Sequence, residues 1–469
     1  MGEIIGAYVM PHPPIILKEI GKGEEKAAQR TIDAMGEIAR NIKGKKPDII
    51  VMITPHGPFF RDAVAISVVP ELKGDFSEFG AQNVGFIKNN DLNLANRIAC
   101  HAERNHIMCA LMDKNMAKEY DVSIDMDHGT MVPLYFIDKE YLDYKLIHIT
   151  YGFLSGEELY RFGKCIQEAL REIEDTAVVI ASGDLSHRLD AESVAGYNRM
   201  GKIFDQRLLQ FLREGDTIEL LNMDAELVEK AGECGLRAVQ IMLGAIDGYD
   251  SYANVLSYEG PYGVGYGAVK LDIGIYNKDK ELVDIISNNS KELIKQIRAA
   301  EDEYVVLARE TLEKYVKHNI TMTPNQNIYR ELLKKTAGVF VSIKKHGELR
   351  GCIGTIYPTT DSIAEEIIQN AIQAGMDDPR FYPVAEEELD KLTYTVDILD
   401  KPQKIQGLHD LDVEKYGVIV TKGAKSGLLL PNLEGVDSVE EQVRIALQKA
   451  GIRPDDEYKL QRFEVVRHR

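Results

Sequence analysis

The sequence predicts an N-terminal α/β domain with a largely parallel central sheet flanked by helices, followed by a smaller C-terminal α+β domain. Three observations support this fold class. The chain has 469 residues, more than a single hydrophobic core usually organises. Through residues 1–275, short β-branched runs alternate with amphipathic stretches, which is typical of a parallel sheet with helical crossovers. After that point strands and helices are mixed without regular alternation.

The prediction for the N-terminal domain rests on its expected strands and on one clear helix. The helix is Ser155–Asp175, where Ser155 and Glu158 form an S-x-x-E capping box and the apolar residues fall on one face. Gly260–Gly267 lacks the GxGxxG spacing of a nucleotide site and leads into a last strand near Leu271–Tyr276. The earlier expected strands are Ile4–Met10, Asp48–Thr54, Val64–Val69, Lys145–Thr150 and Ala177–Ala181.

A linker is expected at residues 276–294, between domains that cover residues 1–275 and 295–469. Polar runs at Asn277–Lys280 and Ser287–Ser290 flank it. The C-terminal domain then begins with the helix Glu301–Val316, whose apolar positions keep the helical period. Its other expected elements are the strands Gly338–Lys344, Leu392–Leu399 and Gly417–Thr421 and the helix Ser362–Ala374.

Composition excludes several classes of protein. The chain holds 56 Lys and Arg against 75 Asp and Glu, a net charge of −19, which disfavours nucleic acid and anionic membranes as partners. No apolar run is long enough to span a bilayer, and the N-terminal residues lack the basic region of a signal peptide. The five cysteines are scattered without a CxxC pair, so we expect a reducing, cytoplasmic environment.

Three histidines closely follow the ends of expected strands. His12 and His56 come directly after Pro11 and Pro55, and His187 closes a short loop after the strand Ala177–Ala181. Parallel strands end at the same edge of a sheet, so these imidazoles are predicted to converge there. Imidazole is the commonest side-chain metal ligand and the usual acid or base at neutral pH. By contrast, His148 lies inside a strand and is expected to have a satisfied polar neighbour rather than a metal.

A metal held by two histidines also needs an anionic donor. Two His and one carboxylate with open positions is the arrangement of non-haem Fe(II) oxygenases. Glu233 lies between Gly232 and Gly235, a flexible setting that suits a ligand turn. A helix start at the same glycines explains the pattern equally well, so the residues alone leave both interpretations open.

The N-terminal domain resembles the catalytic B subunits of class III extradiol ring-cleavage dioxygenases and their relatives in the Memo family. The matching motifs span nearly all of residues 1–275 in family order. They are MPHPPI (Met10–Ile15), TPHGP (Thr54–Pro58), DHGTMVPL (Asp127–Leu134), SGDLSH (Ser182–His187) and GECG (Gly232–Gly235).

The resemblance implies a role for each matched residue. His12 and His56 fall on the two metal-binding histidines, and Glu233 falls where the carboxylate ligand is expected. His187 falls on the acid/base histidine, and His128 on a histidine that contacts substrate. The implied enzyme uses Fe(II) and O2 to cleave a small catechol- or aminophenol-like aromatic, with the metal relaying electrons from the substrate to O2.

One departure from the family pattern concerns the third ligand. Memo-type relatives carry a cysteine near the position of Glu233, and Cys234 is adjacent to it here. If Cys234 faces the metal, softer ions such as Zn or Cu become plausible and oxygenase chemistry becomes doubtful. The alternatives are therefore a metal-binding interaction module without oxygenase activity and, less favoured, a zinc hydrolase.

The C-terminal domain resembles the AMMECR domain, through LRGCIGT (Leu349–Thr355), DPRF (Asp378–Phe381) and SGLLLP (Ser426–Pro431). An arginine beside a cysteine can activate the thiol, although chemistry alone favours a small buried hydrophobe. The candidate pocket here consists of Arg350, Cys352, Asp378 and Arg380, and Arg380 would favour an anionic ligand.

The combination of the two domains implies a pathway. AMMECR domains are known beside Memo-type and radical-SAM proteins in the AmmeMemoRadiSam system, and this chain looks like a fusion of two of those three components. The resemblance therefore implies a radical-SAM protein as a partner. A homodimer is expected because oligomers are common among the relatives.

Overall fold

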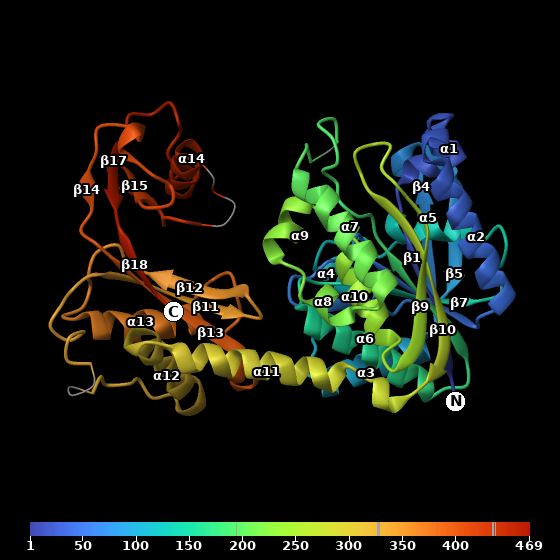
Figure 1. The fold of residues 1–469 in the computed structure, drawn as a ribbon, viewed down its shortest axis with the longest axis horizontal. Helices are drawn as coiled ribbons and strands as arrows, with labels where there is room; N and C mark the ends of the chain where they lie inside the picture. Colours follow the sequence, from blue (N-terminus) through green and yellow to red (C-terminus); the bar gives the residue numbers. More distant parts are fainter. Residues whose placement is uncertain (194, 326–328, 434–435, 437) are drawn as a thin grey trace. The chain divides into compact units, whose positions relative to one another are not determined.

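The computed structural model describes residues 1–193, 195–325, 329–433, 436 and 438–469. The chain forms two compact units, Met1–Ser287 and Asn288–Arg469 (Figure 1). The segment expected to be the linker, residues 276–294, holds the short helix η4 (Lys278–Lys280) and much of the long helix α11 (Val283–Ala300). Within the described part of the chain, no helix combines the length and apolar character needed to cross a membrane.

The described residues of the N-terminal unit form an eight-stranded sheet in the order β6-β3-β7-β2-β8-β1-β10-β9. The four strands β7, β2, β8 and β1 are parallel neighbours, whereas β3 pairs antiparallel with β7 and β10 pairs antiparallel with β1. The strands are β1 (Glu3–Met10), β2 (Ile49–Thr54), β3 (Val64–Ser67), β6 (Cys109–Met112), β7 (Lys145–Thr150), β8 (Thr176–Ser182), β9 (Tyr249–Glu259) and β10 (Tyr266–Tyr276).

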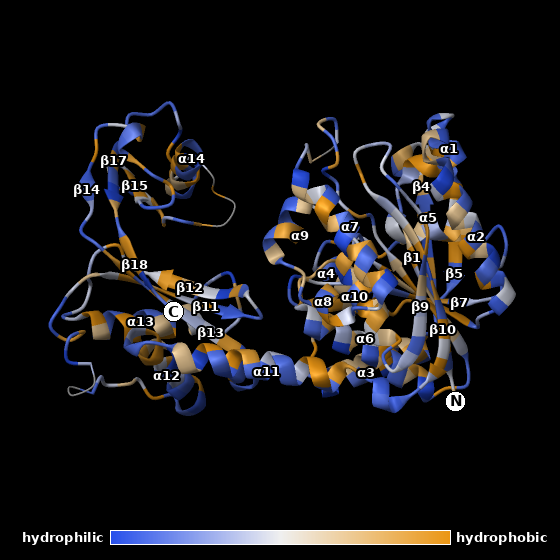
Figure 2. Ribbon diagram, viewed as in Figure 1, coloured by the Kyte–Doolittle hydropathy of each residue, from blue (hydrophilic) through white to orange (hydrophobic). Residues whose placement is uncertain are grey.

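Helices cover both faces of this sheet. Successive strand residues point to opposite faces. In β2, Val51 therefore belongs to the core that includes Ile166 of α6, and Met52 belongs to the core that includes Ile38 of α2. Figure 2 shows the hydrophobic colour along these central strands. The helices are α1 (Lys18–Gly21), α2 (Gln29–Lys45), α3 (Leu92–Arg104), α4 (Lys114–Glu119), α5 (His128–Ile137), α6 (Gly156–Arg171), α7 (Arg199–Glu214), α8 (Thr217–Leu221), α9 (Ala225–Ala231) and α10 (Leu236–Ala245).

Two shorter features of this unit follow strands of the sheet along the chain. A separate hairpin consists of β4 (Glu71–Phe76) and β5 (Ala81–Asn89), joined through the short helix η3 (Ser77–Phe79). The short helix η1 (Pro14–Ile16) follows β1. The predicted capping box is confirmed, because Ser155 and Glu158 cap α6 reciprocally.

The C-terminal unit is α+β, as predicted, with two antiparallel sheets in the orders β12-β11-β13-β18 and β14-β17-β15-β16. The helices α12 and α13 pack on the first sheet and α14 packs on the second. The elements are α12 (Glu303–His318), β11 (Gly338–Lys345), β12 (Glu348–Gly354), α13 (Ile363–Met376), β13 (Leu392–Leu399), β14 (Gln403–Lys404), β15 (Gly417–Lys422), β16 (Lys425–Leu429), α14 (Val439–Ala450), β17 (Lys459–Phe463) and β18 (Val465–His468).

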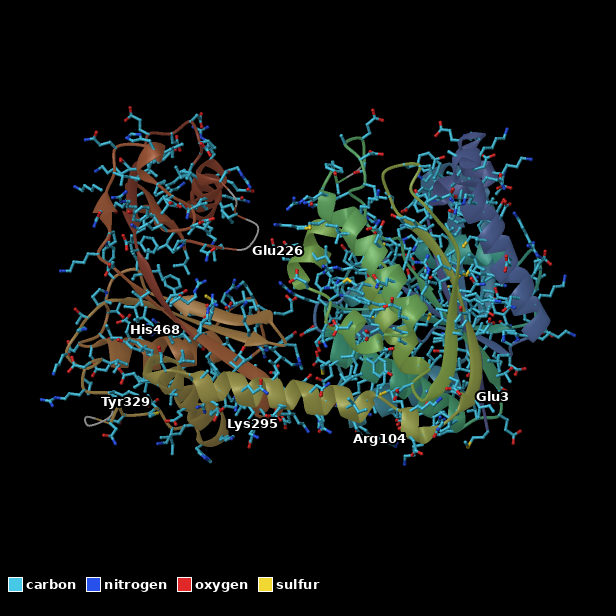
Figure 3. All side chains as sticks on the ribbon, in the orientation of Figure 1. Glu3, Arg104, Glu226, Lys295, Tyr329 and His468 are labelled. Carbon is cyan, nitrogen blue, oxygen red and sulfur yellow. The ribbon has the colours of Figure 1, made fainter. Side chains whose placement is uncertain are left out.

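Side-chain contacts connect the last strand to the start of α12. The ring of His468 stacks on Tyr304, with centroids 3.8 Å apart, and its Nδ1 lies 2.5 Å from Asp302 Oδ2. Figure 3 labels His468 in the C-terminal unit. Asp302 is also the N-cap of α12. The edge strand β18 is therefore held both by its pairing with β13 and by these side chains.

Candidate metal centre

Three parallel strands bring histidines to one edge of the sheet. The neighbours β2, β8 and β1 end at Thr54, Ser182 and Met10. His12 and His56 follow β1 and β2 by two residues, and the loop after β8 leads to His187. The sequence-based expectation that strand ends would deliver these residues to the same edge matches this topology.

The imidazoles of His12 and His56 meet closely. Their Nε2 atoms are 3.1 Å apart, and the ring of His128 stacks on His56 with centroids separated by 4.2 Å. One ligand atom from each of the three histidines lies within 4.8 Å of the others, so the group can hold a metal ion. His12 is buried, whereas part of His56 reaches solvent, so the group is open to the outside on one side.

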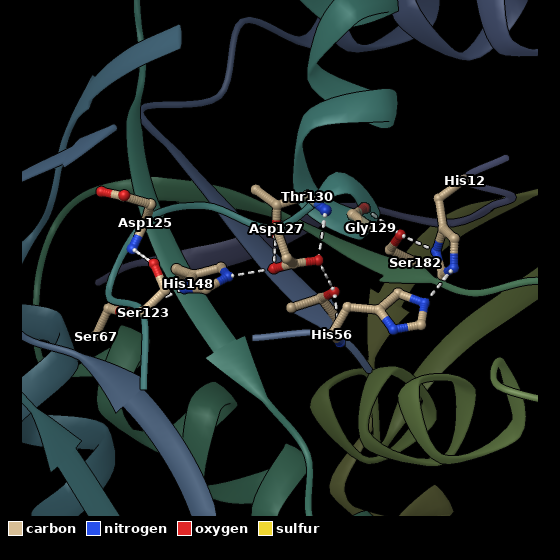
Figure 4. Close-up of polar contacts among 11 residues, drawn as sticks. His12, His56, Ser67, Ser123, Asp125, Asp127, Gly129, Thr130, His148 and Ser182 are labelled. Carbon is tan, nitrogen blue, oxygen red and sulfur yellow. Dashed lines mark hydrogen bonds and ion pairs between the residues drawn. The ribbon is translucent and has the colours of Figure 1, made fainter. Parts of the chain in front are cut away.

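A serine fixes the orientation of the His12 ring. The Ser182 hydroxyl donates to the carbonyl oxygen of Gly129 and lies 2.9 Å from His12 Nδ1 (Figure 4). Because the hydroxyl has only one proton to give, it accepts from Nδ1–H. The lone pair of His12 is then on Nε2, the atom that faces His56. This tautomer is the one that a metal ligand requires.

Asp127 organises the residues behind the cluster. It is the N-cap of α5, so His128 is the first residue of that helix. Asp127 also accepts hydrogen bonds from Thr54 Oγ1 at 2.6 Å and from His148 Nε2 at 2.9 Å (Figure 4). His148 Nδ1 lies 2.9 Å from Ser67 Oγ, so both of its ring nitrogens have partners, as predicted.

The turn between α9 and α10 places Cys234, rather than Glu233, against the imidazoles. Cys234 Sγ is 3.6 Å from His12 Nε2 and 3.6 Å from His187 Nε2. The Glu233 carboxylate instead accepts the Leu236 backbone N–H at 2.6 Å, at the start of α10. The structure therefore does not bring Glu233 to the histidine group. The helix start that the sequence left as an alternative is what this turn forms.

Close backbone packing sets the direction of that turn. A Cβ on Gly183 would lie 2.2 Å from the Cα of Gly235, so the loop after β8 and the turn before α10 are in direct contact. Gly232 ends α9 in the left-handed region with φ of 61°. With the backbone held in this way, the adjacent side chains of Glu233 and Cys234 point to different places.

The environment keeps the imidazoles neutral and the thiol protonated. Loss of hydration, followed by the nearby His56, lowers the pKa of His12 well below its usual range. Loss of hydration and the neighbouring His128 lower the pKa of His56 to about 4. Burial raises the pKa of the Cys234 thiol well above its ordinary value. Protonation of these imidazoles is therefore disfavoured at neutral pH, so their lone pairs are available to a metal ion.

The pKa values of two carboxyl groups beside the cluster are shifted in opposite directions. Burial alone would raise the pKa of Asp127, but hydrogen bonds from His148 and Thr54 outweigh it and hold that pKa below its usual range. Burial raises the pKa of Asp184 to about 7, and its Oδ1 accepts the backbone N–H of His12 at 2.9 Å. Asp184 thus holds the backbone of His12, whereas Asp127 holds the ring of His148 behind the cluster.

In the C-terminal unit, the four candidate pocket residues form two sets of polar contacts. Arg350 forms a bidentate pair with Glu388, at 3.0 and 2.8 Å. Asp378 accepts the backbone N–H of Cys352 at 2.9 Å and pairs with Arg380 at 2.6 Å. The guanidinium of Arg380 is thus already neutralised by a carboxylate, which removes the reason for expecting an anion there.

Sequence reasoning missed Ser182 and Asp127 as positioning residues. Ser182 is the last residue of β8, and Asp127 directly precedes His128. An acidic residue before a helical histidine is a recognisable cap signal. The partners of Ser182 are His12, in the loop after β1, and Gly129, in α5, and both are too distant in sequence to be recognised from the local pattern.

Comparison with known proteins places these features in context. Residues 6–269 match the family model described as the catalytic LigB subunit of aromatic ring-opening dioxygenase, and residues 305–468 match the AMMECR1 model. Protein CA_C1420 of Clostridium acetobutylicum is 45% identical over 466 residues, 99% of each chain. A Thermotoga maritima protein is 48% identical over 171 residues, 36% of this chain and 98% of that protein.

Two solved structures are also similar. The uncharacterised protein PH0010 of Pyrococcus horikoshii has 36% identity and a TM-score of 0.33, covering 35% of this chain and 88% of that chain. The uncharacterised protein JW3007 of Escherichia coli has 14% identity and a TM-score of 0.39, covering 57% of this chain and 99% of that chain.

Proposed function

Because this chain belongs to the family of catalytic LigB subunits of aromatic ring-opening dioxygenases, with an AMMECR1 domain after it, we propose that it is a non-haem metal-dependent dioxygenase. Its substrate would be a small catechol or aminophenol, and its metal Fe(II). The observation that supports this best is the 3.1 Å separation of His12 Nε2 and His56 Nε2.

The donor set fits a metal ion. Two nitrogens 3.1 Å apart can both lie about 2.1 Å from one ion, the usual length of a bond from imidazole to zinc. His128 supplies a third imidazole, and Cys234 Sγ is a fourth nearby donor. Among the residues that the structure describes, the group able to hold an ion contains no carboxylate, and the Glu233 carboxylate instead accepts the Leu236 N–H at the start of α10. The proposed first ligands are thus His12 and His56.

The protein groups around this centre have separate tasks. A bound Fe(II) would supply the redox chemistry between the aromatic ring and O2. His187 is held with Nε2 toward the centre, and burial lowers its pKa, so at neutral pH it can take a proton from a substrate hydroxyl. His128, at the exposed side beside Phe79, can hold the substrate by a hydrogen bond.

Metal analysis and oxygen uptake test the proposal together. The full chain, loaded with Fe(II) under argon, should hold about one ion per chain and consume O2 when catechol or 2-aminophenol is added. His12→Ala and His56→Ala should lose the metal, because each removes one of two adjacent donors. His187→Ala should keep the metal and lose turnover, because only proton transfer is affected.

A histidine outside the centre provides the matched control. His409→Ala changes an imidazole whose side chain is 77% exposed in the C-terminal unit, and it should retain both metal and turnover. A wild-type protein that holds Fe(II) but consumes no O2 across a panel of catechols would reject the oxygenase.

Cys234 favours a second candidate function. A thiol 3.6 Å from His12 Nε2 gives a nitrogen and sulfur donor set, which suits softer ions such as Zn or Cu. The chain would then be a metal-binding interaction module of a radical-SAM pathway. It should retain Zn or Cu in preference to Fe(II), show no oxygen uptake and co-purify with a radical-SAM protein. Preferential retention of Fe(II) together with oxygen uptake would exclude this alternative.

A further inference from the structure

A cavity of about 380 Å³ lies beside the histidine group in the N-terminal unit. This volume is within the range of roughly 300–1,000 Å³ that is usual for small-molecule sites. Pro14 and Ile15 of η1, Ile20 of α1 and Phe79 of η3 form its apolar wall. The cavity therefore lies between the segment that follows His12 and the turn of the β4–β5 hairpin.

Two of the wall residues connect the cavity to the metal centre. The ring of Phe79 meets the ring of His128 edge-on, with centroids 5.5 Å apart. Pro14 is two residues after His12 in the same rigid Pro-His-Pro-Pro segment. A ligand that reached His128 would thus have the cavity directly at its side.

The wall is apolar and accessible. Phe79 is 37% exposed, and Ile15 and Ile20 are half-buried, so apolar area faces water at the mouth of the cavity. At the rim, Lys22 and Glu24 carry opposite charges, so the rim attracts neither sign of ion overall.

We propose that this cavity binds an uncharged apolar substituent of the aromatic substrate while the substrate hydroxyls are at the histidine group. The inference rests on the proposed function, and it narrows the substrate class to catechols or aminophenols that carry an alkyl or similar side chain. Phe79 then separates the two parts of the site, with its edge on His128 and its ring lining the cavity.

Binding measurements with two probes test this inference. The probes are catechol and 4-butylcatechol, titrated calorimetrically under argon into the full chain loaded with Fe(II). The wild-type Kd should be at least about tenfold lower for 4-butylcatechol than for catechol, because even one methylene in an apolar pocket changes discrimination by about tenfold or more. In Ile20→Trp, which fills the cavity, the ratio of the two Kd values should fall to near one.

Controls separate a specific effect from a folding defect. Ile87→Trp adds the same bulk at a site on β5 that is 64% exposed, and it should keep the wild-type ratio. Ile15→Phe provides a second cavity variant and should lower the ratio as well. Circular dichroism and metal content should match the wild type for each variant whose ratio is interpreted.

The outcomes distinguish this inference from the proposed function. Equal affinity for the two probes, no binding of either probe, or a ratio that survives in both cavity variants would overturn the inference. Oxygen uptake with equal KM for both catechols would overturn it too, while the dioxygenase would stand. Preferential binding of 4-butylcatechol without oxygen uptake would support the cavity and reject the dioxygenase.

Discussion

Ser182 determines which ring nitrogen of His12 is free to bind. Its hydroxyl lies 2.9 Å from His12 Nδ1 and gives its own proton to the carbonyl oxygen of Gly129. Both residues are almost fully buried, at 0% and 2% exposure, so water does not replace this interaction. The ring of His12 is thus oriented by a residue on the neighbouring parallel strand β8.

Removal of this hydroxyl should weaken metal binding without unfolding the protein. Ser182→Ala leaves His12 Nδ1 without its acceptor, and partners of this kind contribute about 10- to 100-fold in metal affinity. The affinity for Zn²⁺ should be measured by competition with a chromogenic chelator. Ser362→Ala, a buried serine in the C-terminal unit, serves as the control and should bind as the wild type does. Unchanged affinity in Ser182→Ala would reject this role.

The metal affinity should also report whether Cys234 is a ligand. At pH 7 the imidazoles are neutral because their pKa values are lowered, whereas the Cys234 thiol is protonated because burial raises its pKa. Sulfur binding would therefore release one proton per ion, and affinity would rise about tenfold per pH unit below the thiol pKa.

Calorimetry of Zn²⁺ binding in buffers of different ionisation enthalpy counts this proton. We expect a release near one proton in the wild type and near zero in Cys234→Ser. Cys352→Ser is the matched control, since that cysteine lies in the C-terminal unit. A wild-type release near zero would mean that the ion is held by the three imidazoles alone.

Local patterns were enough to predict the frame of the centre. The β-branched runs before His12 and His56 marked two strands, and the parallel topology then required that their ends share an edge. The capping box at Ser155 likewise fixed the start of α6. These features depend on residues that are close together in sequence, which is why they could be read before the fold was known.

The third donor depended on distant contacts and could not be predicted in the same way. Glu233 and Cys234 are adjacent, so either could have faced the imidazoles. The approach of Gly235 to Gly183, some fifty residues away, decides between them. The partner of Arg350 was equally hard to predict. Cys352 is only two residues away in sequence, but the Arg350 side chain pairs with Glu388. The family resemblance identifies the positions near the centre, but packing decides whether Glu233 or Cys234 faces the imidazoles.

A buried lysine should be important for the stability of the N-terminal unit. Lys164 on α6 has a side chain that is 8% exposed; its Nζ lies 2.6 Å from Glu281 and 3.5 Å from the fully buried Asp247. Lys164→Met leaves both carboxylates without their cation, which typically costs about 3–5 kcal/mol. The measurement is urea-dependent hydrogen exchange of α6 peptides in the full chain.

Two variants sharpen this test. Lys43→Met removes a cation from the pair with Glu140, whose side chains are 56% and 29% exposed, and should cost at most about 1 kcal/mol. The double variant Lys164→Met with Asp247→Asn should recover part of the loss, because the buried charge is gone. Equal effects of Lys43→Met and Lys164→Met would show that burial of the pair does not matter.

The pair of Asp378 and Arg380 should make the β12 strand sensitive to acid. Hydrogen bonds from Arg380 lower the pKa of Asp378 to about 2, below the ordinary carboxyl value of about 3.8. A depressed pKa in the folded state contributes stability above the unfolded pKa and loses it as pH falls from about 4 through 2. Asp378→Asn should therefore destabilise β12 at pH 7, by about 1–3 kcal/mol, since Cys352 N–H and Arg380 lose a charged acceptor.

The difference between wild type and Asp378→Asn should shrink below pH 3, where the wild-type carboxyl is itself becoming protonated. Hydrogen exchange of peptides from Glu348–Gly354, compared at pH 7 and at pH 2.5 after correction for intrinsic rates, measures this change. Asp455→Asn is the control, because its side chain is 76% exposed. A difference of the same size at both pH values would mean that the charge on Asp378 has no part in holding β12, and that shape alone accounts for the effect.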